Sequence, residues 1–298
     1  MTIQLEYKRL VAALYDLYSD REATNIADWV MEHVTGLPKI ERILNKQFPL
    51  NPQQLAQLTD IKTSLLQHKP VQYVLNHTYF ANMRLYVNQN VLIPRPETEE
   101  LVQWVVTDVH NIWPRKAERL CLLDVGTGSG NIALALKKQL PAYDVVAVDV
   151  SDAALDVAKK NASTLALSIT FYQLDVLDSN QRKRLPKFDV IVSNPPYITQ
   201  SEAAKMNRNV LDFEPHLALF VADNDPLIFY NALADMALEL LTADGHIYVE
   251  INETLANEVA QLFSAKGLLQ TTIKQDMQQK NRMVKAGRGQ GKPDANNC

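Results

Sequence analysis

The sequence predicts an α/β fold in which a small N-terminal helical domain precedes a Rossmann-like, mostly parallel sheet of seven strands. Three observations carry this prediction. Residues 1–75 show helical periodicity with almost no strand signal, apolar strands alternate with helices from Pro94 onward, and a Gly-rich turn follows the first of these strands. Such alternation is typical of a parallel sheet with helices on both faces.

Composition limits the classes of function. At 298 residues the chain is long enough for two domains. Its net charge of −4 argues against a protein that grips long stretches of nucleic acid, so no sequence-specific nucleic-acid binding is expected. Cys121 and Cys298 give neither a disulfide framework nor a metal-binding spacing. Since no apolar run approaches roughly 18 residues, the sequence predicts a cytoplasmic protein with no metal and no membrane contact.

The helical domain is predicted over residues 1–75. Two apolar faces recur there at helical spacing: Leu10, Ala13, Leu14 and Leu17 on one, and Ile26, Trp29, Val30 and Val34 on the other. Gly36 and Pro38 end this run, and Pro52 precedes a further helix over residues 53–68. The domain carries eight basic and eight acidic residues, which favours contact with a protein partner over RNA binding.

Residues 71–93 are rich in β-favouring stretches, at 73–75, 78–80 and 85–87, and a β-hairpin linker is predicted over residues 76–93. The α/β domain follows over residues 94–287. Its candidate strands are 121–125, 145–148, 170–173, 190–193, 246–251, 271–274 and 282–286. Basic residues from 274 onward indicate a solvated edge, and residues 288–298 predict a disordered tail.

The Gly-rich turn is the first candidate site. An apolar strand at 121–125 leads into Gly126, Thr127, Gly128, Ser129 and Gly130, and a helix follows over 131–140. Glycines let a ligand approach the backbone, and a helix N-terminus offers free N–H groups. The turn could serve a dinucleotide, a nucleoside, or only close packing of strand and helix. Because the third glycine comes one residue earlier than in a dinucleotide motif, the pattern favours a nucleoside.

Acidic residues end the next two strands. Asp149 follows the strand at 145–148, where a carboxylate can accept both ribose hydroxyls of an adenosine. The alternative role is a helix cap, but Ser151 and Asp152 already supply cap chemistry there. Asp175 and Val176 lie where an adenine ring would rest, with Asp175 interpreted either as a ligand contact or as a surface turn acid.

The second candidate site is Asn194-Pro195-Pro196-Tyr197, at the carboxyl end of the strand at 190–193, where ligands bind in open α/β sheets. Two prolines remove local donors, so the carbonyl of Pro195 is left to accept from a ligand, as is the side-chain oxygen of Asn194. Tyr197 offers a flat face for stacking. These groups predict a clamp for a planar NH₂ group, either an amide or the amine of adenine; the alternative is a rigid turn.

Four motifs together resemble the protein-(glutamine-N5) methyltransferases of peptide chain release factors. They are residues 92–99 (LIPRPETE), 124–130 (DVGTGSG), 148–149 (VD) and 193–198 (SNPPYI). The resemblance implies a class I methyltransferase domain that uses S-adenosyl-L-methionine to methylate the glutamine of a Gly-Gly-Gln tip. It further implies that Gly126–Gly130, Asp149, Val176 and Asn194 bind this cofactor, and that Asn194–Tyr197 hold the glutamine.

The chain departs from the family pattern at three places. Val176 stands where many relatives place a large ring, Asn76 replaces a glycine, and residues 250–253 lack the glycine and glutamine expected after Glu250, so no role is assigned there. Residues 94–98 are expected near the methionine end of the cofactor, although Pro96 and Glu97 also suit a plain helix start. The alternatives are a ribosomal protein glutamine methyltransferase, an N6-adenine methyltransferase of nucleic acid, and a binding module without cofactor.

Overall fold

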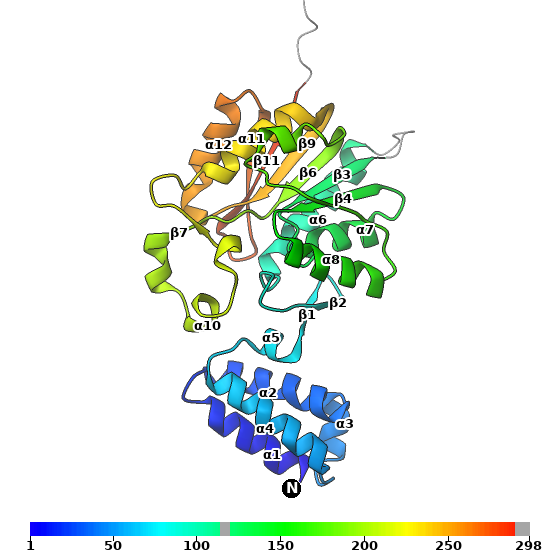
Figure 1. The fold of residues 1–298 in the computed structure, drawn as a ribbon, viewed down its shortest axis with the longest axis vertical. Coiled ribbons are helices and arrows are strands. Elements are labelled where there is room, and N and C mark those ends of the chain that lie inside the picture. The colour runs from blue at the N-terminus through cyan, green and yellow to red at the C-terminus, as the bar shows by residue number, and fades with distance from the viewer. Residues whose placement is uncertain (114–119, 290–298) are drawn as a thin grey trace, which may run out of the picture. The chain divides into compact units, whose positions relative to one another are not determined.

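The computed structural model describes residues 1–113 and 120–289, and it contains two compact units. The first unit comprises Met1–His77 together with Met206–Phe213. The second comprises Thr78–Lys205 and the chain from Glu214 onward. Figure 1 shows helices alone at the N-terminus and a sheet flanked by helices in the second unit. Within the described residues, no helix has the length and apolar character needed to cross a membrane.

The first unit is a helical bundle. Its helices are α1 (Ile3–Leu14), α2 (Asp20–Thr35), α3 (Lys39–Leu44), α4 (Pro52–Leu66), α5 (Val71–Leu75) and the short α10 (Arg208–Leu211). Leu14 of α1 and Val30 of α2 are fully buried in one apolar cluster with Leu65 of α4, so the predicted faces meet in a core. Leu17, however, lies beyond the end of α1. Gly36 ends α2 with φ of +70°, which explains the predicted break.

The β-favouring stretch at residues 73–75 forms no strand, because these residues belong to helix α5. The backbone N–H groups of Tyr73 and Val74 both donate to the Pro70 carbonyl, which starts a helical turn. Burial of Tyr73 and Leu75 in that conformation outweighs their strand propensity. Asn76 then ends the helix at φ of +55°, a left-handed position that favours glycine and that asparagine tolerates.

A hairpin follows, formed by β1 (His77–Phe80) and β2 (Met83–Tyr86). Ala81 and Asn82 both have positive φ at its two-residue turn, as a tight hairpin requires. Phe80, Met83 and Leu85 are buried in a cluster of the second unit.

The second unit is built on a seven-stranded sheet of order β10-β11-β9-β6-β3-β4-β5. The strands are β3 (Cys121–Val125), β4 (Asp144–Asp149), β5 (Thr170–Gln173), β6 (Phe188–Ser193), β9 (Leu241–Glu250), β10 (Leu269–Gln275) and β11 (Asn281–Gly287). From β5 to β9 all neighbours are parallel, whereas β11 is antiparallel to β9 and β10. All seven predicted strands are therefore present, although β9 begins before residue 246.

Two helical layers cover this sheet (Figure 1). The helices are α6 (Pro96–Ile112), α7 (Asn131–Gln139), α8 (Asp152–Thr164), α11 (Ile228–Leu240) and α12 (Ala256–Ala265). Leu122 of β3 is buried in one cluster with α6 and α7, and the next residue, Leu123, in another with α11 and α12. Both leucines are fully buried, which contributes roughly 2 kcal/mol each to folding.

Strand β3 lies where the chain reverses its direction across the sheet. From β3 the chain adds β4 and β5 on one side and then returns to add β6 on the other. Leu123 pairs with Val146 of β4 and with Ile191 of β6. The crevice at the carboxyl ends of β3 and β6 is therefore the expected ligand position in this topology.

The remaining elements are short. They are α9 (Ser179–Arg182), the parallel pair β7 (Ile198–Thr199) and β8 (Phe220–Val221), and 3₁₀ turns at Gln200–Lys205, His216–Ala218 and Glu253–Leu255. The Ile198 N–H donates to the Leu219 carbonyl at 3.0 Å, so the chain is fixed directly after Tyr197.

The C-terminal edge is more paired than expected. Lys280 binds Glu253 at 3.0 Å and Lys285 binds Asp108 at 2.8 Å, so part of the basic segment is engaged with acidic partners. The Arg288 N–H donates to the Gly245 carbonyl at 3.0 Å, so the predicted tail starts with an attached residue. Residues 290–298 of that tail lie outside the described residues.

Gly130 is the N-cap of α7 and lies close to α8, and its replacement by alanine should destabilise the fold. A Cβ there would lie 3.1 Å from Leu134 Cδ1 and 3.2 Å from Ala158 Cβ, at φ of +82°. We expect Gly130→Ala to lower the free energy of unfolding by about 2–4 kcal/mol, measured by chemical denaturation.

Gly267→Ala is the matched control, since Gly267 has φ of +100° but nothing within 4 Å of its Cβ position. It should lose only the backbone contribution. Equal losses in the two variants would contradict a packing role for Gly130.

Candidate functional site

A cavity of about 240 Å³ lies in the second unit, at the carboxyl ends of β3, β4, β5 and β6. Most of the predicted site residues line it: Gly126, Thr127, Gly128, Ser129, Asp149, Asp175, Val176, Asn194, Pro195 and Pro196. The structure thus brings the glycine turn and the proline clamp into one space. Gly130 and Tyr197 do not line the cavity: Gly130 lies against Leu134 and Ala158, and Tyr197 packs with the cluster of α11 and α12.

The glycine turn is tied to β4 and leaves its outer side open. The N–H groups of Gly126 and Thr127 both donate to the Val148 carbonyl, at 2.9 and 3.0 Å. Gly126 and Gly128 have φ of +72° and +54°, and nothing lies within 4 Å of the Cβ positions on either. A ligand can therefore approach the backbone closely, as the sequence predicted.

Asp149 lies between the glycine turn and α8. One carboxylate oxygen accepts from the Gly128 N–H at 2.8 Å, and the other accepts from the Ser151 N–H at 2.9 Å. Ser151 itself caps α8 by accepting from the Ala154 N–H, so Asp149 is not needed as the cap. Each of its oxygens keeps a further lone pair for a ligand hydroxyl. Burial raises the pKa of Asp149, and the backbone hydrogen bonds oppose that rise.

Asp175 and Val176 follow β5 and line the same cavity. One oxygen of the Asp175 carboxylate accepts from the Leu177 N–H at 2.9 Å, a contact that is typical of a turn. Both interpretations of Asp175 therefore remain compatible with its position. Val176 is partly buried and packs against the α11 cluster.

Asn194 follows β6 and faces the start of α6. The side chain of Ser193 donates to the Val125 carbonyl at 2.7 Å, which joins the ends of β6 and β3. The Asn194 amide NH₂ donates to Thr98 Oγ1 at 3.1 Å. Pro195 and Pro196 continue the cavity wall beside it. The arrangement places an amide side chain and a rigid carbonyl-bearing segment at the same end of the cavity.

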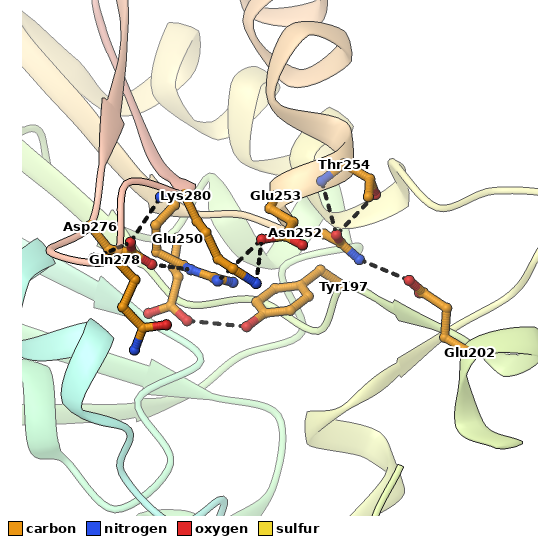
Figure 2. A network of polar contacts seen from close by, with 10 residues as sticks. Tyr197, Glu202, Glu250, Asn252, Glu253, Thr254, Asp276, Gln278 and Lys280 are labelled. Atoms are coloured by element: carbon orange, nitrogen blue, oxygen red, sulfur yellow. Dashed lines mark hydrogen bonds and ion pairs between the residues drawn. The ribbon is translucent and has the colours of Figure 1, made fainter. Parts of the chain in front are cut away.

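Tyr197 is anchored by a buried acid rather than left free (Figure 2). Its hydroxyl donates to Glu250 Oε1 at 3.2 Å, and its ring packs with the α11 and α12 cluster. Burial, followed by the charge of Glu250, raises the pKa of the Tyr197 hydroxyl, so the group stays neutral. That its ring also stacks on a substrate stays a prediction.

Two residues of this network had no assigned role in the sequence. Thr98 of α6 is buried and donates to Glu250 Oε2 at 2.7 Å, and Glu250 is the last residue of β9. Thr98 was expected, with the rest of residues 94–98, near the methionine end of the cofactor, but its side chain was given no role; Glu250 lay in a stretch that departs from the family pattern. The sequence did contain a signal for Glu250, because a buried acid at the end of a long apolar strand needs hydrogen-bond donors.

The loop before α6 is also fixed at the cavity. Arg95 and Pro94 line the cavity, and Arg95 pairs with the buried Glu214 at 2.6 Å. The Ile93 N–H donates to the other oxygen of Glu214 at 3.1 Å. Glu214 thus holds the segment whose sequence resembled the family, in a position against the cavity.

Asp124 of β3 supports the glycine turn through hydrogen bonds and is fully buried. One oxygen accepts from the Thr127 hydroxyl at 2.6 Å and from the Ala133 N–H at 3.1 Å. Its other oxygen has no hydrogen-bond partner among the described residues. Burial raises the pKa of Asp124 to about 7, against a usual value of 3.8. The carboxyl is therefore partly protonated near neutral pH.

Asp124→Asn should flatten the pH dependence of stability. A raised pKa in the fold means that the stability from the neutral carboxyl is present at low pH and is lost as the pH rises through about 7. Between about pH 5 and pH 7.5, the free energy of unfolding of the variant should therefore gain about 2 kcal/mol relative to wild type.

Denaturant titrations at several pH values measure this difference. Asp156→Asn, at a carboxyl that is 80% exposed, is the control and should follow the wild-type pH dependence. Parallel curves for Asp124→Asn and wild type would show that Asp124 is already ionised in the fold.

Known families match both units. Residues 8–75 match the PrmC N-terminal domain, and residues 111–212 match the Methyltransferase small domain. The release factor glutamine methyltransferase of Flavobacterium psychrophilum is 39% identical over 96% of this chain and 99% of its own length. That of Bacteroides thetaiotaomicron is 35% identical over 93% and 96%, and that of Streptococcus pneumoniae is 42% identical over 78% and 79%.

A solved structure supports the fold. The hMettl16 catalytic domain, determined in complex with a MAT2A 3′UTR hairpin, has a TM-score of 0.53 at 14% identity, covering 82% of this chain and 86% of that one. The chain thus has the class I S-adenosylmethionine-dependent methyltransferase fold, and it belongs to the release factor glutamine methyltransferase family.

Proposed function

We propose that this protein transfers a methyl group from S-adenosyl-L-methionine to the side-chain amide nitrogen, N5, of the glutamine in the Gly-Gly-Gln motif of peptide chain release factors. The observation that carries the proposal is the shared cavity. It joins a turn suited to a nucleoside with the Asn194 side-chain amide that the clamp requires. Family membership supplies the identity of the acceptor.

The residues at the turn fit this cofactor. Gly126 and Gly128 leave room for a ligand against the backbone, and Asp149 keeps lone pairs for two ribose hydroxyls. When bound, the cofactor supplies an electrophilic methyl group on a positively charged sulfur. The cavity suits a cation, because Asp149 and Asp175 line it and its one lining arginine, Arg95, is already paired.

The acceptor end fits an amide nitrogen. Such a nitrogen is a weak nucleophile because its lone pair is delocalised into the carbonyl. If the Asn194 oxygen and the Pro195 carbonyl each accept one N–H bond, they orient the NH₂ group and favour its pyramidal form. The nitrogen lone pair then forms the new N–C bond as the C–S bond breaks. The product nitrogen loses a proton afterwards, so no strong base is needed.

The helical unit is proposed as the contact for the release factor. Four large apolar side chains of α3 and the following loop are 59–78% exposed: Ile40, Ile43, Leu44 and Phe48. Large exposed apolar side chains so close together in the sequence suit contact with a protein partner. Because release factors act at the ribosome, we assign the protein to the cytoplasm.

Methyl transfer to a release factor tests this function directly. We expect purified protein with labelled S-adenosyl-L-methionine to label a release factor, and mass spectrometry to place one methyl group on the tip glutamine. A release factor with that glutamine changed to alanine is the control. Equal labelling of both proteins would contradict the proposal, as would labelling confined to a ribosomal protein or to adenine in nucleic acid.

Asn194→Ala should separate catalysis from folding. Loss of an oriented acceptor at the reacting nitrogen is expected to lower kcat by about 10²–10³-fold. Calorimetry should still detect S-adenosyl-L-methionine binding. Asn257→Ala, at an exposed asparagine of α12, is the matched control and should keep wild-type turnover. Unfolding of Asn194→Ala by circular dichroism would instead make Asn194 a structural residue.

A further inference from the structure

We propose that Thr98 and Glu250 are positioning residues, which hold the Asn194 side-chain amide with its oxygen turned toward the acceptor. The proposal rests on the proposed function and deepens it. Its basis is a chain of three polar groups from β9, α6 and the end of β6, whose members are 152 and 96 residues apart in sequence.

When Glu250 is ionised, the number of available protons fixes the direction of each bond in this chain. Glu250 is buried and accepts from Thr98 at 2.7 Å and from Tyr197 at 3.2 Å. A threonine hydroxyl has one proton, and Thr98 donates it to the carboxylate. Only lone pairs of Thr98 therefore face Asn194 at 3.1 Å.

Asn194 must meet those lone pairs with its NH₂ group. A flipped amide would place its oxygen against Thr98 Oγ1 with no proton between two acceptors, and it would direct NH₂ hydrogens at the incoming NH₂ group of the acceptor. Both contacts are repulsive. The Glu250 carboxylate thus determines, through the Thr98 hydroxyl, that the substrate meets the oxygen of the Asn194 amide and not its NH₂ group.

The surroundings of Glu250 make this arrangement sensitive to protonation. Burial raises the pKa of Glu250, and Glu97 of α6 adds to the rise, whereas the bonds from Thr98 and Tyr197 and the charge of Arg282 on β11 lower it. Tyr230 of α11 donates to the backbone carbonyl of Glu250 at 3.1 Å.

Protonation of Glu250 would let the acid donate to Thr98, so that Thr98 could donate to the Asn194 oxygen. The amide would then be held in the wrong orientation. Turnover should therefore fall as the pH is lowered through the raised pKa of Glu250.

The hydrogen bonds that lead from Glu250 through Thr98 to Asn194 form a relay. Variants at Thr98 test this relay in the full-length enzyme with a release factor. Thr98→Val keeps the shape but removes the hydroxyl, and we expect kcat to fall about 10–100-fold with small changes in KM and in cofactor affinity. Thr98→Ser restores the hydroxyl and should recover most of the turnover. Wild-type kcat in Thr98→Val would overturn the proposal, and so would a Thr98→Ser variant that is no better than Thr98→Val.

A second readout does not depend on activity. In ¹⁵N-labelled protein, the Asn194 side-chain NH₂ signal can be assigned by its loss in Asn194→Ala. Wild type and Thr98→Ser should show one slowly exchanging NH₂ proton, and Thr98→Val should not. Equal exchange rates of the Asn194 NH₂ protons in all three proteins would overturn the relay even if release-factor methylation is established. If the methyl acceptor proves to be another molecule, the Asn194 protons should still be protected in wild type.

Glu250→Gln tests the pH dependence. With its oxygen toward Thr98 and its NH₂ toward Tyr197, the glutamine can satisfy both partners, so kcat should stay well above that of Thr98→Val. Because glutamine does not titrate, the acid limb that Glu250 contributes to the pH profile of kcat should be absent. An unchanged acid limb, or a loss of turnover as large as in Thr98→Val, would overturn this role for the Glu250 carboxylate.

Discussion

The parallel pairing of β3 with β6 is the constraint on which the site depends. These strands are distant in sequence, yet their registered ends place the glycine turn and the Asn194 segment at one crevice. The Ser193 hydroxyl strengthens this junction by donating to the Val125 carbonyl, beside the first glycine of the turn. A shift of β6 by one residue against β3 would move Ile191 out of the core that it shares with Leu123, so packing protects the geometry of the site.

Local chemistry explains which parts of the site could be predicted. Three patterns can be recognised from a few neighbouring residues: a glycine with positive φ, an acid that ends an apolar strand, and a proline pair that removes donors. Gly128, Asp149 and Asn194 were therefore identified from sequence and lie on one cavity. The seven strands were predicted for the same reason, since a buried parallel strand is a short continuous apolar run.

The parts that were missed depend on contacts between distant segments. Thr98 was expected near the cofactor, but its bond to Glu250 joins residues 152 positions apart and has no local signal. Residues 73–75 have strand propensity, but burial against the helical unit makes them a helix. Gly130 reads as a ligand residue in the motif, whereas its Cβ position faces Ala158 of α8. In each case a tertiary contact, not local preference, decides the structure.

The cavity has a largely apolar lining that includes two acids, Asp149 and Asp175, and acceptor groups beside Asn194, and this composition limits its substrates. Asp124, Asp149 and Glu250 all have raised pKa values because of burial, and each is held by donors from the backbone or from hydroxyls. Such surroundings accept a ligand that brings both positive charge and N–H donors. An ammonium group has donors but no lone pair to attack with, and a hydroxyl has only one proton for two acceptors. An NH₂ group on a planar carbon donates to both acceptors and keeps its lone pair. The two acceptors of the clamp therefore select an amide or an aromatic amine, and contacts with the partner protein add further specificity.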